Sequence, residues 1–228
     1  MTNRAEAPAG AGLRLFLDTA DRAAWERWLP TGLFYGVTTN PTILERAGLK
    51  CRLPVLAAIV QDALRYPIAE TQVQTWGVQM ESLVENGRAL AALNRRVVVK
   101  VPATLAGVRA AAALHRSGVR TTLTAVYAAH QALIGAAAGC DYVAPYFGRI
   151  GDAGRDAKAE MTAMMAILAA SARPTRLLAA SIRTPADLAM LAAAGVDTFT
   201  IGPAVAEALF DVQATSDAAA EFEAAASR

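Results

Sequence analysis

Short runs of aliphatic and β-branched residues alternate with longer alanine-rich stretches along almost the whole chain. Each apolar run has the length of a buried strand, and each alanine-rich stretch has the composition of a helix. The alternation repeats about every 20 to 30 residues, which is typical of serial strand–helix units. The pattern predicts strands over residues 13–18, 33–39, 67–73, 96–101, 119–124, 141–146, 175–181 and 197–201.

Helical stretches follow the strands and carry their own boundary signals. Pro185 stands where a first helical turn accepts proline, while Gly118, Gly139 and Gly195 fall just past alanine-rich stretches and before the next strand. A last amphipathic stretch, 216–225, is expected to form an extra helix that packs on its own chain or on a neighbouring subunit. Between the strands, helices are predicted for example over residues 103–117, 125–138, 157–172 and 185–194.

Strands that are apolar on both faces, each followed by a crossover, favour a closed parallel barrel over an open sheet. A chain of 228 residues is long enough for one such barrel. The sequence therefore predicts an α/β fold, a single-domain (β/α)8 TIM barrel over residues 13–228 with an extra C-terminal helix. Residues 1–12 have no apolar core after Arg4, so a disordered leader is expected there and not a signal peptide.

Composition and charge narrow the class of partner. The net charge is +2 and the basic residues are scattered, which gives no footprint for nucleic acid or a membrane. Residues 121–140 lack charged side chains, but their threonines, His130 and Gln131 indicate a buried strand, a loop and an inner helix instead of a membrane span. Cys51 and Cys140 form no disulfide framework, as expected in the cytoplasm. Small metabolites are therefore the expected partners.

Metal and nucleotide chemistry are not indicated. His115 and His130 lie in predicted helices without a second ligand four residues on. The glycines form neither a dinucleotide-binding nor a P-loop fingerprint. We therefore expect no metal and no cofactor.

Polar side chains at the ends of the predicted strands are the candidates for function. In a TIM barrel the chemistry lies at the C-terminal ends of the strands, where the loops open. Asx residues at such junctions can also cap the following helix, which is the alternative for Asp18 and Asn40. The candidates are Asp18, Thr38, Thr39, Asn40, Gln72, Lys100, Thr124, Tyr146, Arg149, Ser181 and Arg183.

Lys100 stands out because it follows three valines and precedes Val101 and Pro102, inside a strand that otherwise reads as buried. An unpaired buried charge is costly, and lysines in such places become available as neutral amine nucleophiles. Lysine occurs only three times among the 22 basic residues. Arginine could replace it as a surface charge but not as a Schiff-base amine. A structural ion pair across the barrel, for example with Asp18, is the alternative.

A phenol and a guanidinium emerge together from the sixth strand at Tyr146 and Arg149. A phenol can relay a proton, although tyrosine can also be plain core packing. Arg149, Ser181 and Arg183 together indicate a phosphate clamp, because late-strand loops are the usual phosphate site in barrels. Solvated or ion-paired arginines are the alternative there.

The chain resembles the transaldolase family, and within it the short branch that includes fructose 6-phosphate aldolase. The resemblance covers nearly the whole chain from Leu13, in order. The segments that carry it are LFLDTAD at 15–21, GVTTNPTIL at 36–44, VVVKVPAT at 97–104, TAVYAAHQALIGAAAG at 124–139, YVAPYFGRI at 142–150 and LAASIRTP at 178–185.

The resemblance implies a class I, metal-free aldolase or transaldolase in which Lys100 forms the Schiff base. It further implies that two strand-end residues hold substrate hydroxyls, two position a catalytic water and three bind the acceptor phosphate. It also implies a homo-oligomer, a pentamer or decamer, in which the C-terminal helix reaches a neighbour. These roles fall on Asp18 and Asn40, on Thr124 and Gln72, and on Arg149, Ser181 and Arg183; Thr38 and Thr39 join the substrate-binding set.

Two positions separate the branches of the family. Transaldolases resemble one another in having Glu where this chain has Gln72 and Phe where it has Tyr146, and both choices here are those of the aldolase. The segment PheGly before Arg149 is closer to the transaldolase style, and Arg183 stands where the aldolase commonly has Lys. The expected activity is therefore fructose 6-phosphate cleavage, with transaldolase as the first alternative and a silent sugar-phosphate-binding barrel as the second.

Overall fold

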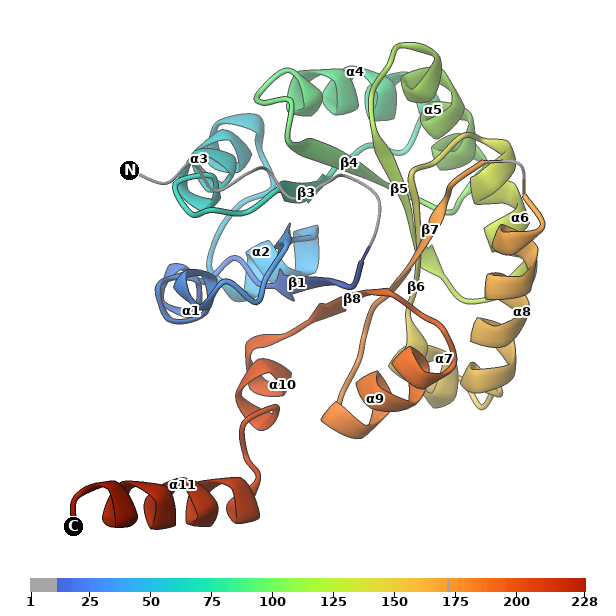
Figure 1. The fold of residues 1–228 in the computed structure, drawn as a ribbon. Coiled ribbons are helices and arrows are strands. Elements are labelled where there is room, and N and C mark those ends of the chain that lie inside the picture. The colour runs from blue at the N-terminus through green and yellow to red at the C-terminus, as the bar shows by residue number, and fades with distance from the viewer. Residues whose placement is uncertain (1–11, 172) are drawn as a thin grey trace.

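The computed structural model describes residues 12–171 and 173–228, and it contains a closed barrel of parallel strands (Figure 1). The strands follow one another around the barrel in chain order, and β8 pairs with β1. This confirms the predicted (β/α)8 TIM barrel. The strands are β1 Arg14–Asp18, β2 Gly36–Thr38, β3 Glu70–Gln74, β4 Val97–Pro102, β5 Thr121–Val126, β6 Tyr142–Pro145, β7 Arg176–Ala179 and β8 Thr198–Ile201.

Helices cover the outside of the barrel, and two of the crossovers hold a pair of helices where the sequence predicted one. The doubled crossovers follow β2 and β6, so a short helix lies directly at the mouth of the barrel in each. The helices are α1 Arg22–Trp28, α2 Pro41–Arg46, α3 Leu53–Ala63, α4 Met80–Ala91, α5 Leu105–Arg116, α6 Ala129–Ala137, α7 Phe147–Asp152, α8 Ala157–Ala169, α9 Pro185–Ala193, α10 Pro203–Ala208 and α11 Gln213–Ala226, with a 3-10 turn η1 at Leu29–Thr31.

All eight predicted strands are confirmed within a few residues of their bounds, and the stretch 121–140 forms strand β5 and helix α6 as expected. One helix start was wrong. The sequence placed it at residue 125, but β5 continues to Val126 and the helix begins at Ala129. The reason is an irregularity at the end of β5, where the register with β6 shifts and Ala125 takes a left-handed backbone with φ 57°.

The inside of the barrel is filled by the side chains that point inward along each strand. Phe16, Val98, Tyr142, Ala144 and Leu178 form a compact apolar cluster there, separate from the larger core between the sheet and the helices. Because side chains alternate along a strand, the residue two positions after each of these also faces inward. This rule carries the polar residues of the strand ends into the mouth of the barrel.

A buried ionic network closes the opposite, N-terminal end of the barrel. Glu70 is 2% exposed and accepts hydrogen bonds from Tyr142 at 2.8 Å, from Tyr35 at 3.4 Å and from Arg120. Arg14 donates to the Tyr142 hydroxyl at 2.5 Å. Burial, followed by the charge of Glu70, raises the pKa of Tyr142 above its ordinary value. At this end of a TIM barrel such a network points to stability and not to catalysis.

Replacing Glu70 with glutamine should lower the free energy of unfolding by about 3 kcal/mol, because it leaves the largely buried Arg14 guanidinium without its carboxylate and removes one of the two carboxylates of Arg120, which keeps Asp141 at 3.6 Å. The measurement is urea unfolding followed by circular dichroism. Glu207→Gln is the matched control, since Glu207 pairs with Arg27 at 2.5 Å on the exposed surface and should cost less than about 1 kcal/mol. Equal losses in the two variants would contradict a structural role for the network.

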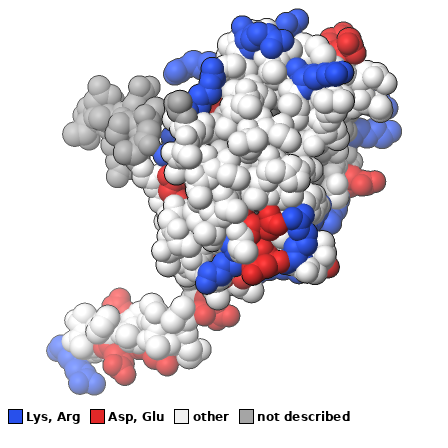
Figure 2. Space-filling view, turned by 90° about the vertical axis from the view of Figure 1, so that its right-hand side faces the viewer, with Lys and Arg blue, Asp and Glu red and all other residues white. Residues whose placement is uncertain are grey.

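The last helix, α11, stands away from the barrel as an arm (Figures 1 and 2). None of its residues is buried, and Phe222 is 72% exposed. The arm starts beside α1, where Phe210 stacks on Trp28 with ring centroids 5.8 Å apart. Of the two expected packings of this helix, the one on its own barrel is not observed, and the one on a neighbouring subunit stays a prediction.

The expected leader and the predicted end of one helix lie partly outside the residues that the structure describes. Residues 1–11 of the expected leader lie outside the described residues, as does Ala172, the predicted end of a helix that closes at Ala169. Among the helices of the described ranges, none is long and apolar enough to cross a membrane.

Candidate active site

Lys100 lies on the inner face of β4, two residues after Val98 of the interior cluster, while Val99 and Val101 belong to the helix-facing core. The lysine is 4% exposed. No hydrogen bond or ion pair joins its amine to another residue within 12–171 and 173–228, so the pairing with Asp18 that the sequence left open is absent there.

Two fully buried polar side chains flank Lys100. Gln72 of β3 is level with Val98, and Thr122 of β5 is level with Lys100. The Thr122 hydroxyl donates to Gln72 Oε1 at 2.8 Å. The other end of the amide, Gln72 Nε2, is enclosed and has no hydrogen-bond partner in the part of the chain that the structure describes. An unpaired buried donor is costly, which makes this amide a candidate for contact with a substrate or a water.

Tyr146 and Thr124 meet at the carboxyl ends of β5 and β6. Their hydroxyl groups lie 3.0 Å apart. The Tyr146 ring is held by Tyr127 in an edge-on contact at 5.6 Å and by Arg149, whose guanidinium lies 4.9 Å from the ring centroid. Tyr146 is thus fixed with its phenol in a polar contact, which is more than plain core packing.

Asp18 sits at the end of β1 and is joined to the next strand by a short hydrogen bond. The Thr38 hydroxyl lies 2.5 Å from Asp18 Oδ1 and 2.6 Å from the hydroxyl of Thr200 on β8. The helix after β1 is capped by Asp21 and not by Asp18, so the capping alternative for Asp18 was wrong. Asp18 therefore keeps its carboxylate at the mouth.

Asn40 and Thr39 differ in which side-chain hydrogen-bonding groups remain available to a ligand. Asn40 caps α2, because its Oδ1 accepts from the backbone N–H of Ile43 at 2.9 Å; its Nδ2 remains able to donate, so the cap does not decide between capping alone and a substrate role. Thr39 follows β2 between Thr38 and Asn40 and is fully buried, with a hydroxyl that has no partner. The structure does not bring the Thr39 hydroxyl to the other candidates.

The three residues expected to hold a phosphate lie together over the ends of β6 and β7. Ser181 takes a left-handed backbone with φ 58°, and its carbonyl accepts from the amide of Gly148 at 3.1 Å. A side chain at Gly148 would meet Ser181 O at 2.5 Å and Arg183 Nε at 2.7 Å, so glycine is needed for the two loops to touch. Arg183 hydrogen-bonds Asp152 and thereby lowers the pKa of that carboxyl. Arg149 forms no salt bridge among the described residues, although its charge also contributes to lowering the pKa of Asp152.

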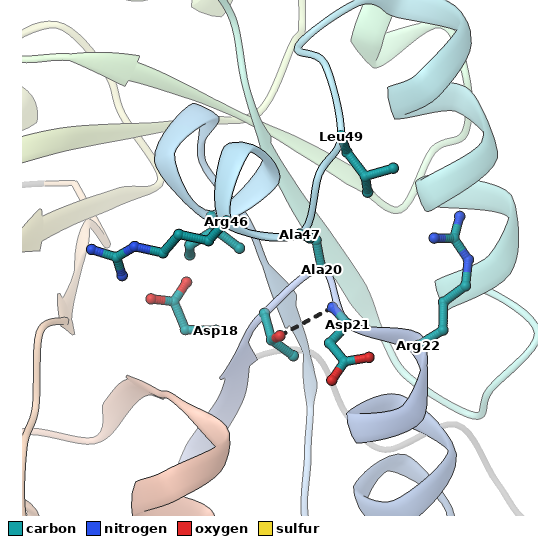
Figure 3. A pocket seen from close by; sticks show the side chains of 9 residues that line it. Asp18, Ala20, Asp21, Arg22, Arg46, Ala47 and Leu49 are labelled. Atoms are coloured by element: carbon teal, nitrogen blue, oxygen red, sulfur yellow. Dashed lines mark hydrogen bonds between the residues drawn. The ribbon is translucent and has the colours of Figure 1, made fainter.

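A cavity of about 550 Å³ opens beside β1 at the mouth of the barrel (Figure 3). Asp18 lines this cavity, whereas Lys100 and Tyr146 do not. Arg46 extends from the end of α2 into the same region and has no carboxylate partner in the described part of the chain, whereas Arg22 across the cavity is paired with Asp62 at 2.8 Å. Arg46 is not among the residues predicted from the sequence, because a basic residue in the last turn of a helix is ordinary.

The C-terminal ends of the strands thus carry a buried amine that has no counter-ion among residues 12–171 and 173–228, a carboxylate, a phenol paired with a hydroxyl, and arginines. An amine can attack a carbonyl carbon, while the carboxylate and the phenol can accept and donate the protons that such an addition moves. The chain is therefore a (β/α)8-barrel protein whose polar candidates lie at the C-terminal ends of its strands, which is where the active sites of such barrels lie.

The comparisons with known proteins name the family. The family model described as Transaldolase/Fructose-6-phosphate aldolase matches residues 15–228. The chain is 37% identical over 213 residues to a protein named "Probable transaldolase" from Phenylobacterium zucineum, covering 92% of this chain and 94% of the relative. A protein of the same name from Kosmotoga olearia is 36% identical over 200 residues, with 87% and 88% covered. The chain therefore belongs to the transaldolase/fructose-6-phosphate aldolase family.

A solved structure agrees with the fold alone. The crystal structure described as a "putative phosphonomutase" from Burkholderia cenocepacia matches with a TM-score of 0.57, covering 93% of both chains at 19% identity. At that identity the likeness concerns the barrel and not the chemistry.

Proposed function

We propose that the protein is a metal-free class I aldolase that cleaves or forms fructose 6-phosphate, with Lys100 as the Schiff-base lysine. The observation that carries the proposal is a lysine on the inner face of the barrel, 4% exposed and without a carboxylate partner in the described residues. Arranging an unpaired amine in this way is costly for stability and useful for nucleophilic attack. The substrates would be a sugar phosphate and dihydroxyacetone, and the enzyme would act in the cytoplasm.

In the proposed reaction the Lys100 amine attacks the ketone carbon of fructose 6-phosphate. The addition product loses water and leaves an iminium ion that draws electrons from the C3–C4 bond. Asp18 takes the proton of the C4 hydroxyl as that bond breaks, and glyceraldehyde 3-phosphate leaves. Asn40 Nδ2 and Thr38 would hold substrate hydroxyls near Asp18, and Arg149, Ser181 and Arg183 would bind the phosphate.

The enamine that remains on Lys100 must then be protonated at C3. A water held by Gln72 and Thr124, with the Tyr146 phenol beside it, would deliver that proton, and the hydroxide left from the same water would add to the iminium and free dihydroxyacetone. The 3.0 Å contact between Thr124 and Tyr146 supports this relay. Arg183 would have to share or exchange its Asp152 partner when the phosphate binds.

Transaldolase is the second candidate, moving the dihydroxyacetone unit to erythrose 4-phosphate, and the names of the curated relatives favour it. Gln72 and Tyr146 favour the aldolase, because a phenol near the enamine speeds its protonation. The test is an assay of fructose 6-phosphate with and without erythrose 4-phosphate. Free dihydroxyacetone without an acceptor supports the aldolase, while turnover that requires the acceptor would replace it by the transaldolase. Ligand-induced stabilisation without turnover would indicate a silent binding barrel.

A homo-oligomer, a pentamer or decamer in this family branch, is part of the same proposal. The arm α11 carries the exposed Phe222 between the acidic residues Glu221 and Glu223, and it leaves its own barrel uncovered. Phe222→Ser should shift the mass measured by light scattering toward the monomer at a given concentration, because it removes apolar contact with a neighbour. Glu221→Gln should leave the mass unchanged. A monomeric wild-type chain would contradict the proposal.

A further inference from the structure

A side-chain hydrogen bond crosses the inner face of β4 directly beside Lys100. Gln72 lies on β3 and Thr122 on β5, so the contact between them passes over the strand that separates them. Gln72 is level with Val98 and Thr122 is level with Lys100. The hydrogen bond therefore crosses the inner surface of β4 between the levels of Val98 and Lys100. Both residues are fully buried.

This bond fixes which end of the Gln72 amide is free. The buried Thr122 hydroxyl donates its hydrogen to Gln72 Oε1 at 2.8 Å. Turning the amide over would set the NH2 group against the hydroxyl and leave the hydroxyl hydrogen without this acceptor. With Oε1 engaged, Gln72 presents Nε2, a group that can only donate, and that atom is enclosed without a partner.

We propose that Thr122 is a positioning residue for the Schiff-base reaction, which holds Gln72 with its NH2 group toward the reacting atoms. The inference rests on the proposed function, because it assigns a task within the chemistry of Lys100. Through Thr122, Gln72 acts as a hydrogen-bond donor to the oxygen that leaves as water when the iminium forms and that returns when it is hydrolysed.

This orientation determines which groups give up protons and which only donate hydrogen bonds as the iminium forms. The hydroxyl of the addition product takes up a proton from the Tyr146 and Thr124 side and leaves as water, while the nitrogen lone pair of Lys100 closes the C=N bond. Gln72 keeps both of its amide hydrogens and supplies only a hydrogen bond to the departing oxygen. A carbonyl turned toward the same oxygen could accept a hydrogen bond but could not donate one, so this role depends on which end of the amide points inward.

The test compares Thr122→Val, which keeps the shape and removes the hydroxyl, with Thr122→Ser, which restores it. The rate of imine formation is measured by stopping the reaction with borohydride at timed intervals and counting modified Lys100 by mass spectrometry. Thr122→Val should slow imine formation and lower kcat about tenfold, with KM within about twofold, and Thr122→Ser should recover most of the loss. Wild-type rates in Thr122→Val would overturn the proposal.

A double-mutant cycle with Gln72→Met separates positioning from a general structural effect. If Thr122 acts through Gln72, Thr122→Val should cause no further loss in the Gln72→Met background. A second tenfold loss there would show that Thr122 acts by another route and would overturn the proposal. Thr122→Ala serves in the same cycle if the valine variant does not fold. Failure to trap the wild-type enzyme is a distinct result, because it removes the proposed function itself and the role of Thr122 with it.

Discussion

Replacing Lys100 with methionine should abolish turnover and leave the barrel at least as stable as before. Methionine fills a similar volume without a charge, and removing a buried ammonium that has no carboxylate partner in the described residues relieves a desolvation cost. Loss of the amine removes the covalent route altogether, so kcat should fall at least about a thousandfold. Lys100→Arg should be equally inactive, because a guanidinium keeps the charge and forms no imine.

The measurements are fructose 6-phosphate cleavage and urea unfolding of the same preparations. Lys158→Met is the matched control, since Lys158 lies exposed on α8 and its loss should change neither quantity beyond small effects. Residual activity within tenfold of the wild type in Lys100→Met would contradict the assignment. Marked destabilisation of that variant would show that an attractive interaction of the Lys100 ammonium stabilises the fold, which contradicts an unpaired amine.

Replacing Tyr146 with phenylalanine should change the balance of the two family activities. The variant loses the phenol that lies 3.0 Å from Thr124, so protonation of the enamine should slow by about ten- to a hundredfold. Transfer to erythrose 4-phosphate does not require that protonation and should fall much less. The ratio of transfer to dihydroxyacetone release should therefore rise. Both products are quantified in one reaction with the acceptor present.

Tyr127 provides the matched control for this substitution. Its ring touches the Tyr146 ring at 5.6 Å, so Tyr127→Phe makes the same chemical change on the neighbouring ring. The control should leave the product ratio unchanged. An unchanged ratio in Tyr146→Phe as well would refute the proton-relay role of the phenol and would favour the transaldolase.

The strands and their order could be predicted from the sequence because parallel strands buried on both faces leave a strong apolar signal. Lys100 was found for the same reason, since a charge inside such a run is conspicuous. Alternation along a strand then says which candidates face inward, and this rule carries Thr38, Lys100 and Thr124 into the barrel. It also explains why Thr39 does not join them: it stands one position from Thr38.

Other features depend on contacts that no local pattern contains. The pairing of Gln72 with Thr122 joins residues 50 positions apart through the barrel register. Glu70 lies near the start of a strand and is charged, and only the closed barrel brings it to arginines from other strands. Arg46 looks like an ordinary helix end until the turn of α2 places it at the cavity. The left-handed backbone at Ala125, where the register of β5 with β6 shifts, could not be predicted because the residue there is alanine and not glycine.

The most direct test of the whole account is reduction with borohydride in the presence of dihydroxyacetone or fructose 6-phosphate, followed by peptide mass spectrometry. We expect one stable substrate-derived adduct on the peptide that contains Lys100, with Lys50 and Lys158 unmodified and activity lost in proportion to labelling. An enzyme that is active on fructose 6-phosphate and remains unmodified at Lys100 under these conditions would contradict it.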